Sequence, residues 1–477
     1  MAKMFIHGES VNAVSGQVLD VLSPVDGQKF DDIPRGDKAD VDLAVQAAHA
    51  ALDGAWGKMT ALERGRLLMK LGEKVLAHHA ELAQLEARDT GKPMATANAD
   101  ITVLARYFEF YGAAADKIHG HVIPFLNGYN VTVLREPLGV TAHIIPWNYP
   151  AQMLGRSIAP ALAMGNAVVV KPAEDACLSP IRVAELAREV GFPPGAINIV
   201  TGLGEEAGAH LSQHPGINFI SFTGSNEVGV LVQQAAAKNV IKCVLELGGK
   251  SPHVVFDDTD LDRAVPIITR GIIANTGQTC TAGSRLIVQK RIYPEMMERL
   301  AKQFSQIKVG TPEMDLDCGP VVNLAQQQRV RHYLAEAQKS GIPVLAQGSL
   351  ASGLPADGYY VTPTLLGDVP PQHCVAQDEI FGPVLAAMSF DTEEEGIRLA
   401  NSTAYGLMAA VWSENGGRQQ RVSKAIKAGQ VYINGFGAGG GVELPFGGVK
   451  RSGHGREKGF MALEEMSTTK TVINYHG

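Results

Sequence analysis

The chain has 477 residues, of which 45% are hydrophobic and 19% charged, and its net charge is −7. This composition is typical of a packed globular protein, and the length predicts two or three domains. Because the sequence has no basic block and no apolar run near the ~18–20 residues of a membrane span, we expect neither a nucleic-acid partner nor a membrane partner.

The cysteines are five in number and scattered, and no two form a C-x-x-C pair. This pattern argues against a disulfide framework and against a zinc site, and we expect no metal. The first ten residues, MAKMFIHGES, lack the apolar segment of a secretory leader. We therefore expect a cytoplasmic protein.

The first half of the chain changes from helical to alternating structure. In residues 39–88 apolar side chains recur at spacings of three and four, which predicts helices that end at Gly91 and Pro93. From about residue 140, β-branched runs such as VTAHIIP and NFISFTG alternate with helical stretches. This alternation predicts a parallel sheet with right-handed crossovers.

A second α/β series begins after Gly249. SPHVVFDD and SRLIVQK are expected strands, and YPEMMERLAKQFSQI and NLAQQQRVRHYLAEAQKS are expected helices. GFGAGGG, at 435–441, is expected to form a flexible loop. The tail STTKTVINY is a β-type run that stands alone after a helix, so it needs an edge to pair with, and another subunit is one candidate.

Cys280 lies in NTGQTCTAG, a stretch of small, turn-forming residues. An ordinary buried cysteine is the alternative, although such surroundings are unusual for a core position. A free thiol titrates near ~8.5, so a nucleophile here would need helix amides or a nearby cation to form the thiolate. Glu246, in LELGGK, is a carboxylate beside two glycines and could activate water. The pair predicts a covalent thioester cycle that ends in hydrolysis.

Three further motifs indicate ligand contacts. Asn148 lies between the prolines of PWNYP, where its amide could stabilise an oxyanion or simply occupy a turn. Lys171 and Glu174 end the strand of VVVKPAE, where a carboxylate could accept both hydroxyls of an adenosine ribose; a surface ion pair is the alternative. SFTGSNEVG leads from a strand into a helix start that suits phosphate, whereas TGLGEEA is only a weak dinucleotide fingerprint.

Taken together, PWNYP, VVVKPAE, SFTGS, LELGGK, NTGQTC, DEIFGPV and PFGGVKRSGHGRE resemble the NAD(P)-dependent aldehyde dehydrogenase superfamily. They occur in that family's order and cover roughly residues 5–475. The resemblance implies an α/β fold with a Rossmann-like cofactor domain, an α/β catalytic domain and a small β oligomerisation element. It also implies NAD as the cofactor and a small-molecule aldehyde as the substrate.

The resemblance further implies how the chain is divided. The NAD-binding domain would comprise 1–118 and 138–248, the catalytic domain 249–450, and the oligomerisation element 119–137 and 451–477. In that last element a hairpin near 120–137 would join the terminal strand near 467–476. We expect a homo-oligomer, either a dimer or a dimer of dimers, that is, a homotetramer.

Residue by residue, the family match implies specific roles. Cys280 is the nucleophile, Glu246 the general base for deacylation, and Asn148 forms the oxyanion hole with the Cys280 amide. Glu457, in GREKG, matches a second glutamate that assists proton relay. The implied cofactor-binding residues are Ile145, Pro146, Trp147, Asn148, Lys171, Ala173, Glu174, Gly204, Gly208, Phe222, Thr223, Gly224, Ser225, Val228, Glu246, Leu247, Gly248, Cys280, Glu379 and Phe381.

These cofactor residues divide by the part of NAD that they would contact. Gly224 and Ser225 match the pyrophosphate contacts at the helix start, and Glu379 and Phe381 match the nicotinamide-ribose contacts. The TGLGEEA loop would lie toward the adenine, so its resemblance to a phosphate-binding fingerprint is misleading.

The implied substrate-binding residues are Tyr149, Met153, Arg156 and Phe446. Tyr149 replaces a more frequent phenylalanine. Arg156 takes a position that is aromatic in aliphatic-aldehyde members, but arginine occurs there in succinic semialdehyde dehydrogenases and also in benzaldehyde and vanillin dehydrogenases. The semialdehyde enzymes add a second arginine, and here its position holds Ala274.

A cation in such a tunnel has two solutions. Arg156 could clamp the carboxylate of an ω-oxo acid, or it could pair with an internal acid while the tunnel accepts aromatic aldehydes. Two rival functions remain as well. A CoA-acylating member would usually lack a glutamate at position 246, and a non-catalytic structural protein would not need Cys280, Glu246 and Asn148 together.

Overall fold

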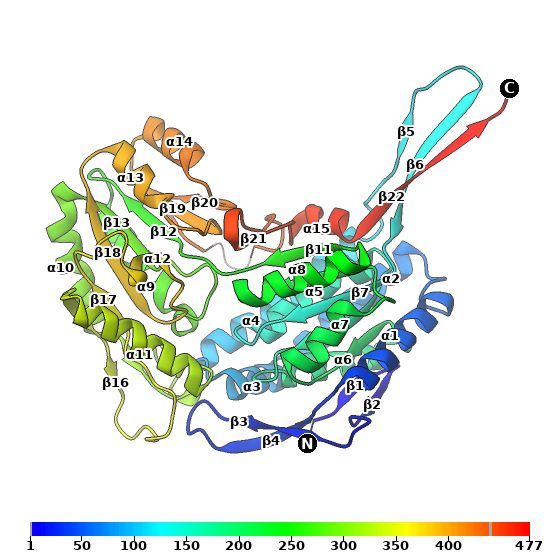
Figure 1. The fold of residues 1–477 in the computed structure, drawn as a ribbon, viewed down its shortest axis with the longest axis horizontal. Helices are drawn as coiled ribbons and strands as arrows, with labels where there is room; N and C mark the ends of the chain where they lie inside the picture. Colours follow the sequence, from blue (N-terminus) through cyan, green and yellow to red (C-terminus); the bar gives the residue numbers. More distant parts are fainter. Residues whose placement is uncertain (1, 438–440) are drawn as a thin grey trace.

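The computed structural model describes residues 2–437 and 441–477. Residues 438–440 of GFGAGGG, which we expected to form a flexible loop, therefore lie outside the described residues. Figure 1 shows two α/β units side by side and a narrow β arm that projects from one of them and carries the C-terminus. The fold is a mixed α/β fold with parallel sheets, as the alternating pattern predicts.

The first unit contains an eight-stranded sheet whose five central strands are parallel. Antiparallel strands close its two edges, because short hairpin and loop segments pair there instead of crossover units. In spatial order the strands are β2 (Glu9–Val11), β1 (Met4–Ile6), β9 (Ile197–Ile199), β8 (Ala167–Pro172), β7 (Val140–Ile145), β10 (Phe219–Thr223), β11 (Lys242–Glu246) and β21 (Gly453–His454).

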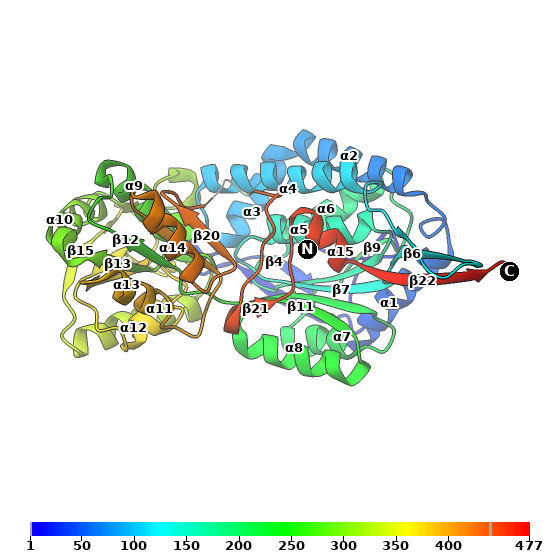
Figure 2. The ribbon, with the colours of Figure 1, turned by 90° about the horizontal axis from the view of Figure 1, so that it is seen from above.

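Helices cover both faces of this sheet, as Figure 2 shows from above. Local sequence signals set their ends: Asp37 and Thr60 form capping boxes at two helix starts, and Gly91, with φ 78°, ends a third as predicted. The helices are α1 (Lys38–Asp53), α2 (Ala61–Ala77), α3 (His79–Thr90), α4 (Met94–Ala114), α5 (Pro150–Ala163), α6 (Leu178–Glu189), α7 (Ala209–Gln213), α8 (Asn226–Asn239) and α15 (Gly459–Glu465).

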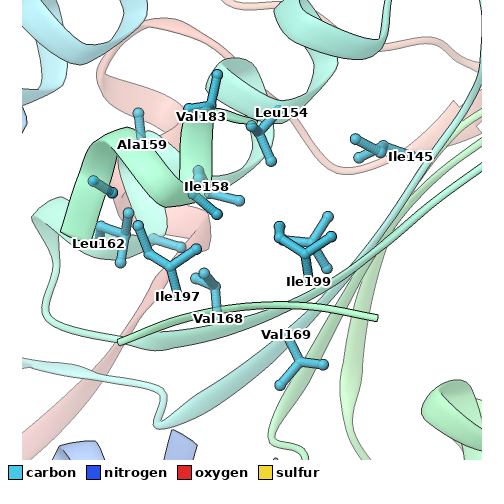
Figure 3. Close-up of a cluster of buried hydrophobic side chains, with 14 of the residues drawn as sticks. Ile145, Leu154, Ile158, Ala159, Leu162, Val168, Val169, Val183, Ile197 and Ile199 are labelled. Atoms are coloured by element: carbon cyan, nitrogen blue, oxygen red, sulfur yellow. The ribbon is translucent and has the colours of Figure 1, made fainter. Parts of the chain in front are cut away.

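The core of the first unit lies between α5 and the central strands. Figure 3 shows Ile158 and Leu162 of α5 facing Val168 and Ile197 of the sheet, while Val169 points to the opposite face. All five side chains are at most 3% exposed. A strand buried on both faces is typical of a parallel sheet between helical layers, and this packing fixes α5 against the strand ends that form the candidate site.

The second unit contains a seven-stranded sheet in which only one edge strand is antiparallel. The order is β15 (Val344–Gln347), β17 (Thr364–Leu366), β18 (Val384–Phe390), β13 (Arg285–Gln289), β12 (Pro252–Val255), β19 (Met408–Trp412) and β20 (Gln430–Ile433). Its helices are α9 (Leu261–Ile273), α10 (Tyr293–Phe304), α11 (Leu324–Lys339), α12 (Cys374–Gln377), α13 (Glu393–Ala400) and α14 (Gly416–Ala425), and β14 (Lys308–Val309) pairs with β16 (Ser349–Leu350) beside the sheet.

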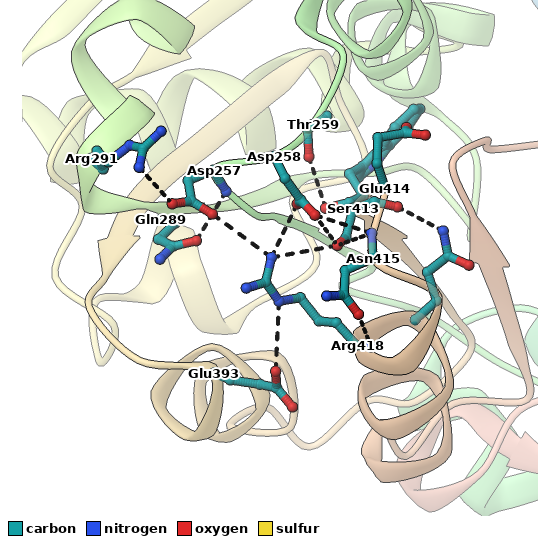
Figure 4. A network of polar contacts seen from close by, with 12 residues as sticks. Asp257, Asp258, Thr259, Gln289, Arg291, Glu393, Ser413, Glu414, Asn415 and Arg418 are labelled. Atoms are coloured by element: carbon teal, nitrogen blue, oxygen red, sulfur yellow. Dashed lines mark hydrogen bonds and ion pairs between the residues drawn. The ribbon is translucent and has the colours of Figure 1, made fainter.

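A charged network joins the helices of the second unit to the end of β12. Arg418, on α14, lies 3.1 Å from Asp258, 3.7 Å from Asp257 and 3.6 Å from Glu393 of α13, as Figure 4 shows. The guanidinium also lies 4.6 Å from the ring of Phe256. One cation that meets three carboxylates holds two helices and a strand end together.

The arm is a three-stranded antiparallel sheet in the order β22 (Ser467–Tyr475), β6 (Tyr129–Pro137) and β5 (His121–Ile123). The pairing of β22 with β6 confirms the hairpin-to-tail contact that the family resemblance implied. The tail therefore does not stand alone, because its own chain supplies an edge. A separate hairpin joins β3 (Val18–Leu22) and β4 (Lys29–Pro34).

The predicted domain boundaries stay a prediction. Within residues 451–477, which the family resemblance places in the oligomerisation element, β21 pairs with β11 in the first sheet and α15 packs against α5. Only β22 belongs to the arm. The glycines of RSGHGRE let the chain return to the sheet edge, with Gly453 at φ 108°.

Among the described residues, none of the helices combines the length and the apolar character that a membrane span requires.

Candidate active site

The loop that carries Cys280 is held in a strained turn. After α9 the chain passes through three successive left-handed residues, Asn275, Thr276 and Gly277, with φ of 49°, 55° and 73°. A Cβ at Gly277 would lie 2.2 Å from the Gly382 carbonyl carbon, so only glycine fits. Non-glycine residues in this region cost about 1–3 kcal/mol each and are typical of functional sites. The turn brings Cys280, which is partly exposed, to the face of the first unit.

Asn148 is joined directly to this loop. Its side-chain Nδ2 donates to the carbonyl oxygen of Gln278 at 2.9 Å, and its Oδ1 has no hydrogen-bond partner within 2–437 and 441–477. Its backbone carbonyl accepts from Lys92 Nζ at 3.1 Å and from Asn275 Nδ2 at 2.9 Å. The structure therefore brings the PWNYP turn and the cysteine loop together. The side-chain amide of Asn148 contacts Gln278, which lies two residues before Cys280 in the sequence.

Glu246 is the last residue of β11 and is 2% exposed. Burial raises the pKa of this carboxyl to about 8; Arg156 lowers the pKa and Glu457 raises it. Burial also raises the pKa of the Cys280 thiol to about 12, although Arg156 and Lys458 lower it. The cations expected near the thiol are thus present, and they act against the effect of burial.

Two of the side chains predicted to contact substrate, Arg156 and Phe446, lie in direct contact. Arg156 Cζ lies 4.2 Å and Lys458 Nζ 4.9 Å from the centre of its ring, and Met153 Sδ lies 3.8 Å from Arg156. Tyr149 Oη bonds with Thr279 Oγ1 at 2.8 Å, so the extra hydroxyl of this tyrosine is used within the cysteine loop.

Of the two arrangements left open for Arg156, the structure has the internal one. Its guanidinium pairs with Glu457, and its Nη2 lies 3.6 Å from Glu246 Oε2. Although burial alone would lower it, these carboxylates hold the pKa of Arg156 above its usual value. Glu457, expected near the site from the family match, is therefore part of the charged cluster.

The residues predicted to bind the cofactor lie in a row along the carboxyl ends of the central strands of the first sheet. Ile145, Thr223 and Glu246 end β7, β10 and β11, and Lys171 lies near the end of β8. The carboxyl ends of neighbouring parallel strands are where ligands bind in such sheets. The residues that follow those strands are Pro146, Trp147, Ala173, Glu174, Gly224, Ser225, Leu247 and Gly248.

A cavity adjoins the end of this row where the family resemblance implies the adenosine. Lys171 Nζ lies 2.6 Å from Glu174 Oε2, and a cavity of about 170 Å³ adjoins Glu174. A Cβ at Gly204 would meet no atom within 4 Å, and one at Gly208 only the Lys171 side chain at 3.9 Å. Within TGLGEEA, Gly204–Gly208 form a π-helical turn. This is compatible with the expectation that the segment does not bind phosphate.

The other end of the edge carries the remaining predicted contacts. Ser225 caps α8 by accepting from the Val228 amide at 3.3 Å. Glu379 accepts from the Gly249 amide at 2.9 Å, and burial raises the pKa of this carboxyl to about 7. Phe381 adopts φ 60° and meets the Trp147 ring edge-on at 5.3 Å. Phe222 lies under Gly224, where a Cβ would come within 2.6 Å of its ring.

Three residues near the site were not singled out by the sequence motifs. Lys458 is half-buried over Phe446, and burial lowers the pKa of its amine to about 7. Ser221 donates to Glu457 Oε1 at 2.9 Å, and Lys92 supports Asn148. Lys458 directly follows Glu457 in the sequence, which was the available signal, whereas the contacts of Ser221 and Lys92 depend on the fold. No cluster of three metal-ligating side chains occurs in the described part of the chain.

Comparisons with known proteins place this site in a family. The model of the aldehyde dehydrogenase family matches residues 11–472. The mitochondrial benzaldehyde dehydrogenase of Antirrhinum majus is 40% identical over 99% of this chain and 88% of its own length. The chain therefore belongs to the aldehyde dehydrogenase family.

Solved structures agree with this assignment across the whole chain. A putative aldehyde dehydrogenase from Burkholderia cenocepacia is 55% identical with a TM-score of 0.99, and the match covers all of both chains. The betaine aldehyde dehydrogenase of Staphylococcus aureus, solved in complex with NAD+, is 36% identical with a TM-score of 0.97 over 100% of this chain and 95% of its own. The fold expected from the motifs is thus confirmed.

Proposed function

We propose that the protein oxidises an aldehyde to its carboxylic acid with NAD, through a thioester on Cys280. The observation that carries this proposal is the meeting of three groups on facing elements. The cysteine loop, the amide of Asn148 and the buried carboxylate of Glu246 lie around one point between the two units. A nucleophile, an oxyanion donor and a base are the parts that acyl transfer requires.

The edge of the first sheet fits NAD. Glu174 and Lys171 suit the two ribose hydroxyls, the open face over Gly204 and Gly208 suits a flat ring, and the α8 start suits a pyrophosphate. Relatives solved with NAD+ support the same choice. When bound, NAD supplies the acceptor for the hydride that leaves the aldehyde carbon.

In the first step the Cys280 sulfur bonds to the aldehyde carbon. Its thiol proton first passes to water, and Arg156 and Lys458 are the cations that favour the resulting thiolate against burial. The carbonyl oxygen then carries the negative charge, and Asn148 Nδ2 and the Cys280 amide are its proposed donors. For this purpose Asn148 must share or leave its present bond to Gln278. One such donor contributes about 10²–10³ in rate.

When the oxyanion collapses, the former aldehyde carbon loses its hydride to the acceptor and the adduct on Cys280 becomes a thioester. In the second step water hydrolyses this thioester. Glu246 accepts a proton from water, the water oxygen bonds to the acyl carbon, and the carbon–sulfur bond breaks to release the acid and the Cys280 thiolate. The pKa of about 8 suits a group that must take up and release a proton near neutral pH. The presence of Glu246 favours this outcome over transfer of the acyl group to coenzyme A.

We propose a substrate without a carboxylate, and an aromatic aldehyde in particular. Arg156 is already matched by Glu457 and Glu246, so it offers no unpaired charge to an ω-oxo acid. Tyr149, Met153 and Phe446 give the site an aromatic and apolar lining.

Glu246→Gln and Cys280→Ala test the two steps separately. We expect Glu246→Gln to form one NADH per site and then stall with the acyl group on Cys280, whereas Cys280→Ala forms none while still binding NAD. Cys374→Ala, which removes a partly exposed cysteine outside the site, is the matched control and should stay active. Steady turnover by Glu246→Gln would remove the proposed base, and acyl-CoA as the product would favour the acylating alternative.

Matched aldehydes test the substrate class. Benzaldehyde is compared with 4-formylbenzoate, and hexanal with 6-oxohexanoate, by kcat/KM on the wild-type protein. We expect each neutral aldehyde to exceed its charged partner, and benzaldehyde to exceed hexanal. A preference for the charged partner in both pairs would contradict the proposal and favour an ω-oxo acid.

A homo-oligomer formed through the arm is also part of the proposal, whereas the cytoplasmic location stays a prediction.

A further inference from the structure

Arg156 lies at the centre of a buried charged cluster behind Cys280. It projects from α5 and is 3% exposed, it pairs with Glu457, and its Nη2 lies 3.6 Å from Glu246 Oε2. A cation so buried is stable only when it is paired. Because both partners belong to the chain itself, the charge of Arg156 is matched before any substrate enters.

Glu457 is held from the side opposite Arg156. Ser221, on β10, donates to Glu457 Oε1 at 2.9 Å, and Ser157 donates to Ser221 at 3.3 Å. Ser157 also contacts His143 Nδ1 at 2.5 Å, and burial lowers the pKa of this imidazole to about 3, so it is neutral. Glu457 is therefore fixed between a strand and a guanidinium, and it fixes Arg156 in turn.

Glu246 is restrained in a different way. Neither of its carboxylate oxygens has a hydrogen-bond partner among the residues that the structure describes, and 3.6 Å from Arg156 is longer than a hydrogen bond. On another side lies Gly447, with φ 154°, where a Cβ would come within 2.8 Å of Glu246 Oε1. The carboxylate is thus held by charge and can turn without breaking a directional bond.

We propose that Arg156 is a positioning residue for deacylation: fixed by Glu457, it holds the Glu246 carboxylate where that group can accept a proton from water, and it does not bind substrate. This inference rests on the proposed role of Glu246 as the general base. It explains how a cation can occupy a tunnel wall without selecting an anionic aldehyde.

Charge sets the direction of the expected pH effect. The groups facing Glu246 are Arg156, Glu457, Arg456 and Lys458, and the Cys280 thiol lies on the opposite loop. Burial raises the pKa of Glu246 to about 8, Arg156 lowers it, and Glu457 raises it by less than Arg156 lowers it. The base works only when ionised, so thioester hydrolysis should rise with pH through about 8. Removing the cation must move this rise to higher pH, and removing the charge of Glu457 must move it to lower pH.

The experiment follows the acyl group on Cys280. Wild-type, Arg156→Leu and Glu457→Gln proteins with NAD are mixed with the best aldehyde of the panel, and the NADH burst and the mass of the intact acyl-protein are recorded over a pH series. We expect each protein to form one NADH per site, more slowly in Arg156→Leu because Arg156 also favours the Cys280 thiolate. The pH at which hydrolysis is half-maximal, the midpoint, should move in opposite directions in the two variants. Below the midpoint, each unit of upward shift slows hydrolysis about tenfold.

Two variants test whether charge is the cause. Arg156→Lys, which keeps a cation, should move the midpoint of the pH dependence part of the way back to the wild-type value. Arg64→Leu is the matched control, because Arg64 is half-buried, donates to the carbonyl of Ala163 on α5, and pairs with no carboxylate among the described residues. The midpoint should not move in this control.

The possible results separate this inference from the proposed function. A stalled acyl-protein in Glu246→Gln with an unmoved midpoint in Arg156→Leu removes the positioning role alone, whereas continued hydrolysis in Glu246→Gln removes the base itself. A higher KM of Arg156→Leu for 6-oxohexanoate but not for hexanal would show a substrate clamp and overturn the inference. If Arg156→Leu does not fold, Arg156→Leu with Glu457→Gln removes both partners, and its midpoint must still move upward.

Discussion

A buried guanidinium requires negative charge, and the source of that charge decides what Arg156 does. The family resemblance implies that Arg156 takes a position that is aromatic in aliphatic-aldehyde members. An arginine there is compatible both with a substrate clamp and with an internal ion pair. Glu457 lies three hundred residues further along the chain, and the short distance between them is visible only in the fold. One ion pair therefore separates two substrate classes.

Glu174 leads to a prediction on cofactor choice. A carboxylate about 4 Å from a 2′-phosphate costs up to about 4 kcal/mol at an effective dielectric near 20, and less at a side chain that is one-third exposed. We expect kcat/KM to favour NAD over NADP at least about tenfold, and Glu174→Gln to narrow the difference. Glu205→Gln, an exposed carboxylate in the nearby π-helical turn, is the control. Equal kcat/KM for both cofactors in the wild-type protein would place Glu174 away from the ribose.

Lys92 connects three elements and leads to a prediction on stability. Its Nζ lies 3.1 Å from Glu86 on α3 and 2.6 Å from Asp100 on α4, and it donates to the Asn148 carbonyl. Lys92→Met would leave two carboxylates buried without a cation, which costs about 3–5 kcal/mol. Denaturant unfolding should show this loss.

Exposed Lys38, which pairs with Asp42 at the surface, is the matched comparison for Lys92. Lys38→Met should unfold at nearly the wild-type denaturant concentration, because an exposed pair contributes little. A similar midpoint for Lys92→Met would mean that the buried acids take up protons without cost.

How far the elements could be predicted depends on whether their signals are local. Apolar spacing predicts the helical segment that ends at Gly91, but not its division at His78 into α2 and α3. Local patterns also predict β12, β13, α10 and α11. The segment from β15 to β18 was not assigned, because its strands are short and β15 runs antiparallel with an irregular register. Local patterns do not contain that pairing.

The candidate site was predictable for the same reason and to the same limit. Cys280, Glu246 and Asn148 each lie in a short, recognisable motif, so the sequence alone indicates them. The left-handed turn at Asn275 and Thr276, which carries the cysteine loop, has no sequence signal of its own, because such strain is maintained by tertiary contacts. The contacts of Ser221 and Lys458 likewise depend on strands and loops that meet only after folding.

In a single chain, one face of the arm leaves large apolar side chains exposed. By the strand register, Ile473 and Ile123 both lie opposite Val131, and Tyr475 lies opposite Tyr129, so these residues share one face. Ile473 and Tyr475 are 61% and 67% exposed. Figures 1 and 2 show that this thin sheet projects away from the rest of the molecule. A thin sheet with exposed apolar side chains is marginal in water unless a partner covers it.

We expect a second copy of the chain to cover this face, which gives a homodimer or a dimer of dimers with closed symmetry. Ile473→Lys places a charge on the apolar face, and light scattering at micromolar concentration should then show a smaller species than the wild-type protein. Asn474→Lys, on the opposite face of the same strand, is the control and should leave the assembly intact. Deletion of residues 467–477 removes β22 and exposes the β6 edge, so that variant should dissociate or unfold. A wild-type monomer at the same concentration would contradict the assembly, and equal effects of the two lysine variants would show that the apolar face is not the contact.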